Sequence, residues 1–140
     1  MPNPVSRETI PEGQQGIEPL DFLASLSDKI EGFFYRCIND KNYTMLRLTS
    51  GYDRMLGRSS ADLVLGKRSF TDLVHPDDKP AMYNMIDRSL GLQERWRVGY
   101  RLQALNGEYI RVFETGGGVH DKNGKLLYLD GVILDMSRLR

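Results

Sequence analysis

The sequence predicts a single α+β domain, in which a five-stranded antiparallel sheet carries short helices packed on one face. Three observations predict this class. Two strand-like segments open the folded part, several short helical segments follow, and three longer strand-like segments joined by tight turns come last. That order is typical of helices covering one face of an antiparallel sheet. A chain of 140 residues fits one such domain.

The first 31 residues divide into two parts. Residues 1–17 are rich in proline, glycine and polar side chains, which predicts a disordered leader. The apolar positions that then recur at helical spacing are Phe22, Leu23, Leu26 and Ile30. We expect an N-terminal amphipathic helix over residues 18–31. Because a helix of this length is marginal alone, its apolar stripe must pack on this domain or on a second copy.

The middle of the chain predicts a hairpin followed by short helices. Residues 33–38 and 43–48 are expected to form two antiparallel strands around a polar turn. The helical segments expected next are 51–57, 59–66, 70–73 and, as the longest, 80–90. Pro80 suits a first helical turn, and the preceding acidic residues Asp77 and Asp78 favour a helix N-terminus.

The last third of the chain predicts three strands. Residues 95–102 alternate between apolar and polar side chains, as a half-exposed strand does. Asn106-Gly107 is a strong hairpin turn, and residues 109–115 form the next strand. The three glycines at 116–118 are expected to interrupt that strand or to bulge its end. A second turn at 121–124 leads into a strand from Leu126 to about Met136.

The composition narrows the class of function. Acidic and basic residues number 19 each, so electrostatics gives no reason to expect a nucleic acid or an anionic membrane as partner. The lone Cys37 forms no disulfide within the chain, which favours a reduced, cytoplasmic setting. No apolar run reaches the length of a membrane span, and no signal peptide is visible.

Several motifs, in this order and spacing, carry a family resemblance. They are residues 51–57 (GYDRMLG), 73–78 (LVHPDD), 100–102 (YRL), 106–109 (NGEY), 121–125 (DKNGK) and 131–137 (GVILDMS). Over residues 32–137 the sequence resembles the PAS sensory domain family, and within it the subgroup that carries His-Pro-Asp-Asp. The resemblance implies a sheet cupped by short helices around a small apolar pocket.

The resemblance also implies a role and a route for signals. Domains of this family serve as sensory, dimerisation or relay modules of histidine kinases, diguanylate cyclases, chemoreceptors or transcription regulators. The last strand leaves through a corner that here reads Asp135-Met136-Ser137, so residues 138–140 are expected to begin a linker to an effector domain. We expect Asp135 and Ser137 to relay the signal, with Arg101 as the first candidate to pair with Asp135.

Candidate pocket residues follow from the apolar pattern of the helices and strands. They are Met55, Leu73, Met82, Ile86 and Trp96, together with Met85. Methionine adapts to irregular shapes, which suits either a ligand pocket or a plain core, and the sequence leaves both readings open.

No cofactor is supported by a specific motif, although haem and flavin are both known in the family. His75 is the one histidine in the helical region, but its His-Pro-Asp-Asp setting favours a loop or capping role. Cys37 lies in the first strand rather than in the helical segment from which photoreceptor relatives bond flavin. Neither a metal-ligand cluster nor a catalytic constellation can be assembled, so we expect no enzymatic activity.

Two functional hypotheses remain open. The first is a sensory and signal-relay module of a larger bacterial-type signalling protein, which binds a small ligand or cofactor in the pocket and transmits through its last strand. The alternative is a ligand-free interaction module that forms a homodimer through residues 19–30 and the sheet's outer face. The last strand supports the alternative, because apolar side chains occupy both of its faces.

Overall fold

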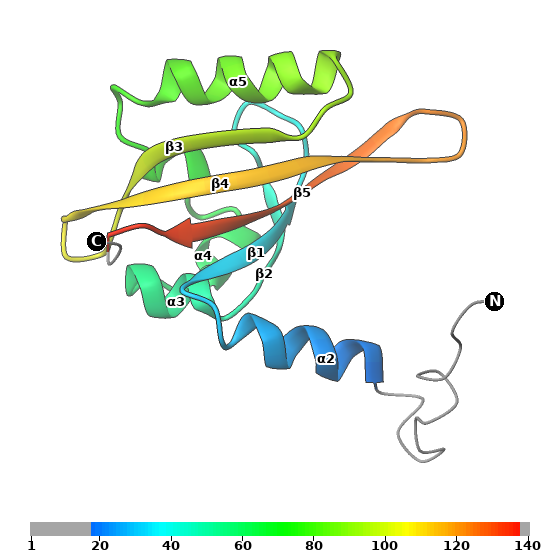
Figure 1. Ribbon diagram of the computed structural model, residues 1–140. Helices are drawn as coiled ribbons and strands as arrows, with labels where there is room; N and C mark the ends of the chain where they lie inside the picture. Colours follow the sequence, from blue (N-terminus) through cyan, green and yellow to red (C-terminus); the bar gives the residue numbers. More distant parts are fainter. Residues whose placement is uncertain (1–17, 138–140) are drawn as a thin grey trace.

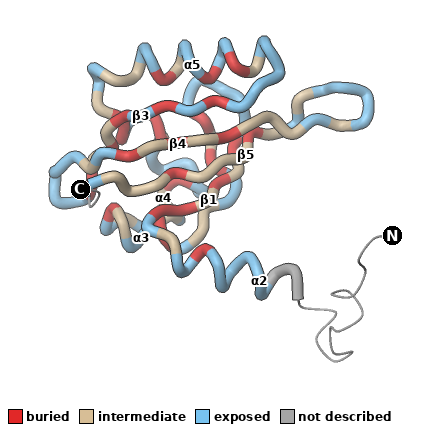
Figure 2. The backbone as a smooth tube through the Cα atoms, in the orientation of Figure 1, coloured by how far each residue is buried: buried red, intermediate tan, exposed pale blue. Residues whose placement is uncertain are grey.

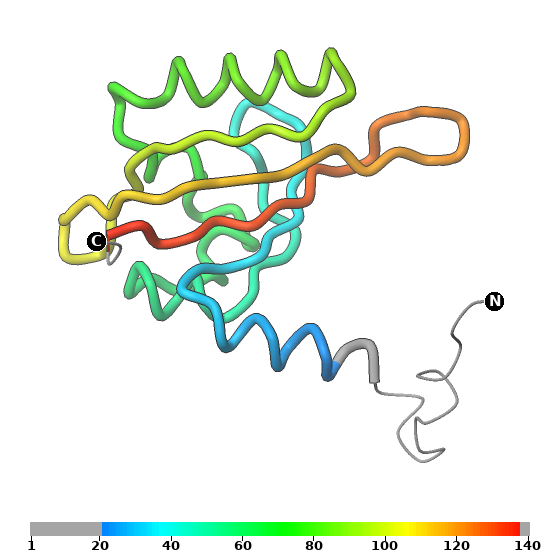
Figure 3. The backbone as a smooth tube through the Cα atoms, in the orientation of Figure 1, coloured from blue at the N-terminus to red at the C-terminus, as the bar shows by residue number. Residues whose placement is uncertain are grey.

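The computed structural model describes residues 18–137, with side chains from residue 21, and its centre is one five-stranded sheet (Figure 1). The strands are β1 (Gly32–Cys37), β2 (Met45–Leu48), β3 (Trp96–Gln103), β4 (Tyr109–His120) and β5 (Leu126–Asp135). They lie in the order β2-β1-β5-β4-β3, and every neighbouring pair is antiparallel. The strands that come first and last along the chain, β1 and β5, are thus neighbours in the middle of the sheet (Figure 3). The predicted fold class is confirmed, while the leader at 1–17 and the linker at 138–140 lie outside the described residues.

The helices come between β2 and β3, apart from one that precedes the sheet. They are α2 (Glu18–Ser27), α3 (Gly51–Leu56), α4 (Ser60–Val64), the 3-10 helix η2 (Phe70–Leu73) and α5 (Lys79–Gly91). Buried side chains from α3, α4, η2 and α5 join those of the strands in one hydrophobic core, seen as the buried segments of Figure 2. Within residues 18–137, no helix combines the length and the apolar character that crossing a membrane requires.

Local chemistry accounts for the helix boundaries. The Ser59 hydroxyl accepts a hydrogen bond from the backbone N–H of Ala61, which caps α4. Pro80 occupies the first turn of α5, where its missing N–H costs nothing. Met82 and Ile86 of α5 are buried against the sheet, whereas Met85 lies at the edge of that face and is 40% exposed. The expectation that Met85 faces the core was therefore wrong.

The three glycines of β4 do not break the strand. β4 runs without interruption from Tyr109 to His120, and the pairing of Trp96 with Gly116 and of Gly116 with Gly131 is regular. The only irregularity between β4 and β5 lies further on, between Val119 and His120. The predicted interruption at 116–118 was wrong, because a glycine in a strand also serves where a neighbouring side chain must lie close to the backbone.

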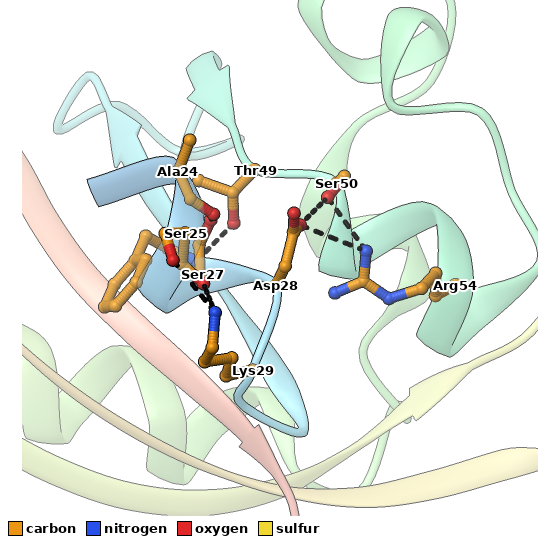
Figure 4. Close-up of polar contacts among 9 residues, drawn as sticks. Ala24, Ser25, Ser27, Asp28, Lys29, Thr49, Ser50 and Arg54 are labelled. Atoms are coloured by element: carbon orange, nitrogen blue, oxygen red, sulfur yellow. Dashed lines mark hydrogen bonds and ion pairs between the residues drawn. The ribbon is translucent and has the colours of Figure 1, made fainter. Parts of the chain in front are cut away.

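Helix α2 is attached to the domain by polar contacts at its C-terminal end (Figure 4). The Ser50 hydroxyl donates to Asp28 at 3.0 Å, and Arg54 of α3 donates to Ser50 at 2.9 Å and lies 3.5 Å from Asp28. The apolar side chains of α2 remain on the surface, with exposed fractions of 59% for Phe22, 48% for Leu23 and 42% for Leu26. The apolar stripe of α2 therefore does not pack on the described part of this domain.

Candidate functional site

The inner face of the sheet carries a carboxylate at its centre. Side chains of β4 alternate between the core and the outer face, and the buried positions are Val112, Glu114 and Gly116. Glu114 is only 3% exposed. A carboxylate at such a position is uncommon, because an acid is almost never fully buried without a partner.

Three neutral donors surround the Glu114 carboxylate. Tyr35 Oη of β1 donates to Oε2 at 2.5 Å, and Trp96 Nε1 of β3 donates to the same oxygen at 2.7 Å. The hydroxyl of Tyr100, also on β3, donates to Oε1. Every ion pair within the described residues lies elsewhere, so no described Lys or Arg balances the charge of this carboxyl.

Two glycines allow the rings of Tyr35 and Trp96 to reach Glu114. Trp96, Gly116, Gly131 and Tyr35 follow one another across four adjacent strands, in one row of the sheet. A Cβ atom on Gly116 would lie 2.6 Å from the Trp96 ring, and one on Gly131 would lie 2.5 Å from the Tyr35 hydroxyl. The two aromatic side chains therefore lie flat over bare backbone, and any larger residue at either glycine would displace them.

A small cavity adjoins this cluster. It is lined by Tyr35, Cys37, Tyr43, Met45, Phe70, Ile86, Glu114 and Leu129, and its volume is about 10 Å³. Tyr43 belongs to this lining, and its hydroxyl is buried and has no hydrogen-bond partner among the described residues. Tyr43 also has a φ of 49°, in the left-handed region that bulky residues rarely adopt. Backbone strain together with an unpartnered buried hydroxyl is typical of a functional position.

Burial dominates the electrostatics of the cluster. It raises the pKa of Glu114 above its ordinary value, although the hydrogen bonds from Tyr100, Tyr35 and Trp96 act in the opposite direction. Burial and the adjacent Glu114 also raise the pKa of Tyr35 and that of Tyr100 well above 10. Both tyrosines thus stay protonated and remain donors across the range in which a carboxyl titrates.

The predicted pocket residues lie in three different places. Ile86 lines the cavity. Three others are fully buried core residues: Leu73, Met82 and Trp96. Of these, Trp96 donates a hydrogen bond to Glu114, which lines the cavity. Met55 lines a separate surface groove between α3 and the turn that joins β3 to β4.

The His-Pro-Asp-Asp segment is joined to strand β3 by an ion pair between Asp78 and Arg101. Asp78 accepts two hydrogen bonds from the Arg101 guanidinium at 2.9 Å each and one from the Arg101 backbone N–H. Asp78 is the residue before α5, yet its side chain makes no capping hydrogen bond there. Asp78 thus lies at the helix N-terminus, as expected, but its side chain binds Arg101 instead of capping the helix, because a guanidinium offers a stronger, charge-assisted contact.

The expected pairing of Asp135 with Arg101 is also corrected. Arg101 is held by Asp78, and the Asp135 carboxylate instead accepts from the backbone N–H of Ser137 at 2.8 Å and from its hydroxyl at 2.5 Å. The corner is fixed to the sheet by two backbone bonds, from Asp135 to Glu31 and from Met136 to Arg111. Whether these residues relay a signal stays a prediction.

His75 and Cys37 occupy structural positions in the described chain. The His75 ring packs on Tyr109 with 4.6 Å between centroids, and its Nδ1 accepts from the Asp77 backbone N–H. Burial raises the pKa of the Cys37 thiol. The cavity beside Cys37 has about the volume of one water molecule, so neither haem nor flavin fits the site as it stands. Within residues 18–137, no group of three or more His, Cys, Asp or Glu side chains is placed to hold a metal ion.

Sequence reasoning missed Glu114, Tyr35 and Tyr43. The strand alternation that places Val112 in the core also places Glu114 there, so this one signal was present. By contrast, the sequence gives no sign of the positive φ at Tyr43 or of the strand order that brings Tyr35 near Glu114.

Comparison with known proteins agrees with this architecture. A family model described as the PAS fold matches residues 45–133, which is more than half of the chain. No curated protein sequence gives a significant match.

Solved structures of sensory domains superpose on the chain. The PAS domain of a protein from Colwellia psychrerythraea gives a TM-score of 0.70 at 14% sequence identity, covering 86% of this chain and 99% of that chain. The N-terminal domain of a diguanylate cyclase with PAS/PAC sensor from Marinobacter aquaeolei gives 0.63 at 19% identity, covering 76% and 95%. A sensory box histidine kinase/response regulator from Burkholderia thailandensis gives 0.63 at 18% identity, covering 86% of each chain. At these identities the similarity shows the fold alone.

Proposed function

The chain belongs to the PAS-fold family, and we propose that it senses a small ligand in the cavity beside Glu114 and relays this to an effector domain. Sensory signalling is the general role of the family.

The unpartnered hydroxyl of Tyr43 carries the proposal of a ligand. A buried polar atom without a partner costs about 1–3 kcal/mol, and the strained backbone of Tyr43 adds to that cost. Such a cost is recovered when a guest supplies the missing hydrogen bond. The guest would then contact Glu114 and Tyr35, since these line the same cavity.

Strand β5 offers the route from the cavity to the exit of the domain. The Tyr35 ring rests on Gly131 of β5, and Glu114 lies opposite Ile133 of β5. Asp135 follows two residues after Ile133, so a guest that moves Tyr35 or Glu114 acts directly on the strand that ends at Ser137. We propose that Asp135 and Ser137 pass this movement on.

The setting that we propose is a larger cytoplasmic signalling protein of bacterial type, such as a two-component histidine kinase or a diguanylate cyclase. Similar folds come from a protein named as a histidine kinase/response regulator and from one named as a diguanylate cyclase. In this proposal the chain supplies the input and the effector domain supplies any catalysis.

Ligand screening with Trp96 as reporter tests the proposal. Trp96 is the only tryptophan of the chain, and its indole N–H donates to Glu114. We expect a guest of the cavity to shift the indole N–H resonance of Trp96 and the backbone amides of β5 with the same saturation curve. A broad panel of small polar molecules that leaves both unchanged, with no small molecule released on denaturation, would contradict the proposal.

The alternative is a homodimerisation module, and the exposed apolar side chains of α2 favour it. Phe22, Leu23 and Leu26 remain on the surface of a helix that is attached mainly by its C-terminal end. If this alternative holds, Leu23→Asp weakens self-association in sedimentation, while Ala24→Asp on the other side of the helix does not. Equal behaviour of the two variants would remove the alternative.

A further inference from the structure

The polar atoms that line the cavity beside Glu114 are mostly acceptors. The donor hydrogens of Tyr35, Tyr100 and Trp96 all point at the Glu114 carboxylate. Glu114 Oε2 accepts two of these bonds and Oε1 accepts one, so one acceptor position of Oε1 remains. The Tyr35 oxygen, whose hydrogen is used, also has an acceptor position beyond the one that faces the Trp96 indole N–H.

Few donors remain to serve those acceptors. Among the side chains that line the cavity, only the Tyr43 hydroxyl and the weak donor Cys37 have a hydrogen to offer. A guest that itself carries several donor hydrogens therefore matches the lining better than a guest that carries acceptors.

Charge leads to the same class of guest. Glu114 is buried among neutral donors, and each described ion pair involves another acid. Rings of Tyr35, Tyr43 and Phe70 line the same space, and aromatic faces attract cations. A carboxylate among aromatic rings is a favourable setting for an ammonium group.

Size limits the guest. The cavity of about 10 Å³ holds roughly one water-sized group, which an ammonium group matches in size and in its tetrahedral set of donors. Tyr43 lies in the loop between β1 and β2, so a group with one or two carbons more would have to displace this loop.

We propose that the ligand of this sensory site is a small protonated amine, either ammonium itself or the ammonium head of a short primary amine. The inference rests on the proposed ligand-sensing function and names the ligand class of the same cavity. The ammonium group donates to Glu114 Oε1 and to the oxygens of Tyr43 and Tyr35.

The test compares cations with a neutral probe of the same size. The full chain is titrated with ammonium chloride, methylammonium chloride or methanol at constant ionic strength, with sodium chloride as the balancing salt. The readouts are the indole N–H resonance of Trp96 and the melting temperature. We expect saturable changes with ammonium and methylammonium, and none with sodium or methanol.

Three variants show whether the response comes from the cavity. Glu114→Gln keeps the shape of the side chain and removes its charge, so it should abolish the response. Tyr43→Phe removes one hydrogen bond to the guest and leaves the Glu114 cluster intact, so it should weaken binding about threefold to tenfold. Asp130→Asn removes a carboxylate from the outer face of the sheet and should respond like the unchanged chain.

The outcomes separate this inference from the proposed function. If methanol or another neutral molecule shifts Trp96 while the cations do not, the pocket is a sensor of a different ligand class and the amine inference fails. If neither cations nor the broad panel shift Trp96, both the inference and the proposed function fail. A response to ammonium that survives Glu114→Gln would overturn the inference as well.

Discussion

Two acids that each accept three hydrogen bonds, Glu114 and Asp78, have opposite surroundings. Glu114 is buried, accepts from three neutral donors and has no described cation nearby. Asp78 is 20% exposed at its side chain and forms a two-pronged ion pair with Arg101. Burial raises the pKa of Glu114, whereas the hydrogen bonds from Arg101 lower the pKa of Asp78.

This difference separates a fixed contact from a responsive one. The Asp78 carboxylate already has its cation, so it holds the start of α5 on β3 and has little left to bind. Glu114 lacks a cation and lies beside the unpartnered hydroxyl of Tyr43, so a proton or a cationic guest changes its energy strongly. The comparison predicts that changes at Glu114 alter the response of the domain, while changes at Asp78 alter only its stability.

The largest expected effect comes from truncating Glu114. Glu114→Ala leaves the donors of Tyr35, Tyr100 and Trp96 without an acceptor in the core, which should lower the free energy of unfolding by about 3–5 kcal/mol. Glu114→Gln retains an acceptor and should cost about 1 kcal/mol. Urea denaturation measures both. Equal losses would show that the three donors find other partners.

Glycine 131 gives the next largest effect. A Cβ atom at this position would overlap the Tyr35 ring, so Gly131→Ala should cost about 1–3 kcal/mol and shift the Trp96 indole resonance. Gly117→Ala is the matched control, because its Cβ would lie 3.5 Å from Arg95 in ordinary contact. A Gly131→Ala variant as stable as Gly117→Ala would mean that Tyr35 does not lie over β5.

Breaking the Asp78–Arg101 ion pair should lower the free energy of unfolding by less. Because the pair is partly exposed, Asp78→Asn should destabilise the domain less than Glu114→Ala does, and the loss should shrink in 1 M salt. The neighbouring Asp77 is exposed, and Asp77→Asn should leave the free energy of unfolding nearly unchanged. Thermal unfolding at low and high salt checks both variants, and a loss that does not depend on salt would contradict the ion-pair account.

The smallest effect is the pH dependence, and the two acids should give it opposite signs. The raised pKa of Glu114 means that its contribution is full below about pH 4.3, the unfolded value, and is lost as pH rises through the folded pKa. The lowered pKa of Asp78 means that its contribution is present above about pH 3.9 and is lost as pH falls.

Difference measurements isolate these two contributions from other titrating groups. The stability of the unchanged chain minus that of Glu114→Gln should fall as pH rises above about pH 4.3, while the same difference for Asp78→Asn should fall as pH drops below about pH 3.9. If both differences changed with pH in the same direction, the opposite pKa shifts of Glu114 and Asp78 would be contradicted.

The fold was largely predictable, because it depends on local signals. Alternating side chains in β3 and the Asn106-Gly107 turn mark a hairpin regardless of what surrounds it. The role of the glycines was not predictable in the same way. Gly116 and Gly131 are far apart in sequence and become neighbours only through the strand order. The space that they leave for the rings of Trp96 and Tyr35 therefore depends on the tertiary structure.

Of the residues that line the cavity beside Glu114, the sequence pattern pointed to few. The apolar pattern of α5 identified Ile86 as a pocket residue, and alternation brought Trp96 inward. The apolar pattern gave no sign of Glu114, because a charged residue in a strand is usually on the solvent side. Arg101 was paired with the wrong acid, since both Asp78 and Asp135 are distant in sequence and only the packing decides between them.

The central claim is that a change in the protonation of Glu114 alters the structure along β5, and one measurement tests it most directly. A pH titration followed by NMR records the Trp96 indole N–H together with the backbone amides of Ile133 and Met136, in the unchanged chain and in Glu114→Gln. The account predicts that all three resonances move with one midpoint above the ordinary pKa of glutamate, and that none moves in this way in the variant. A Trp96 signal that moves alone, or three signals that stay constant above pH 5, would contradict it.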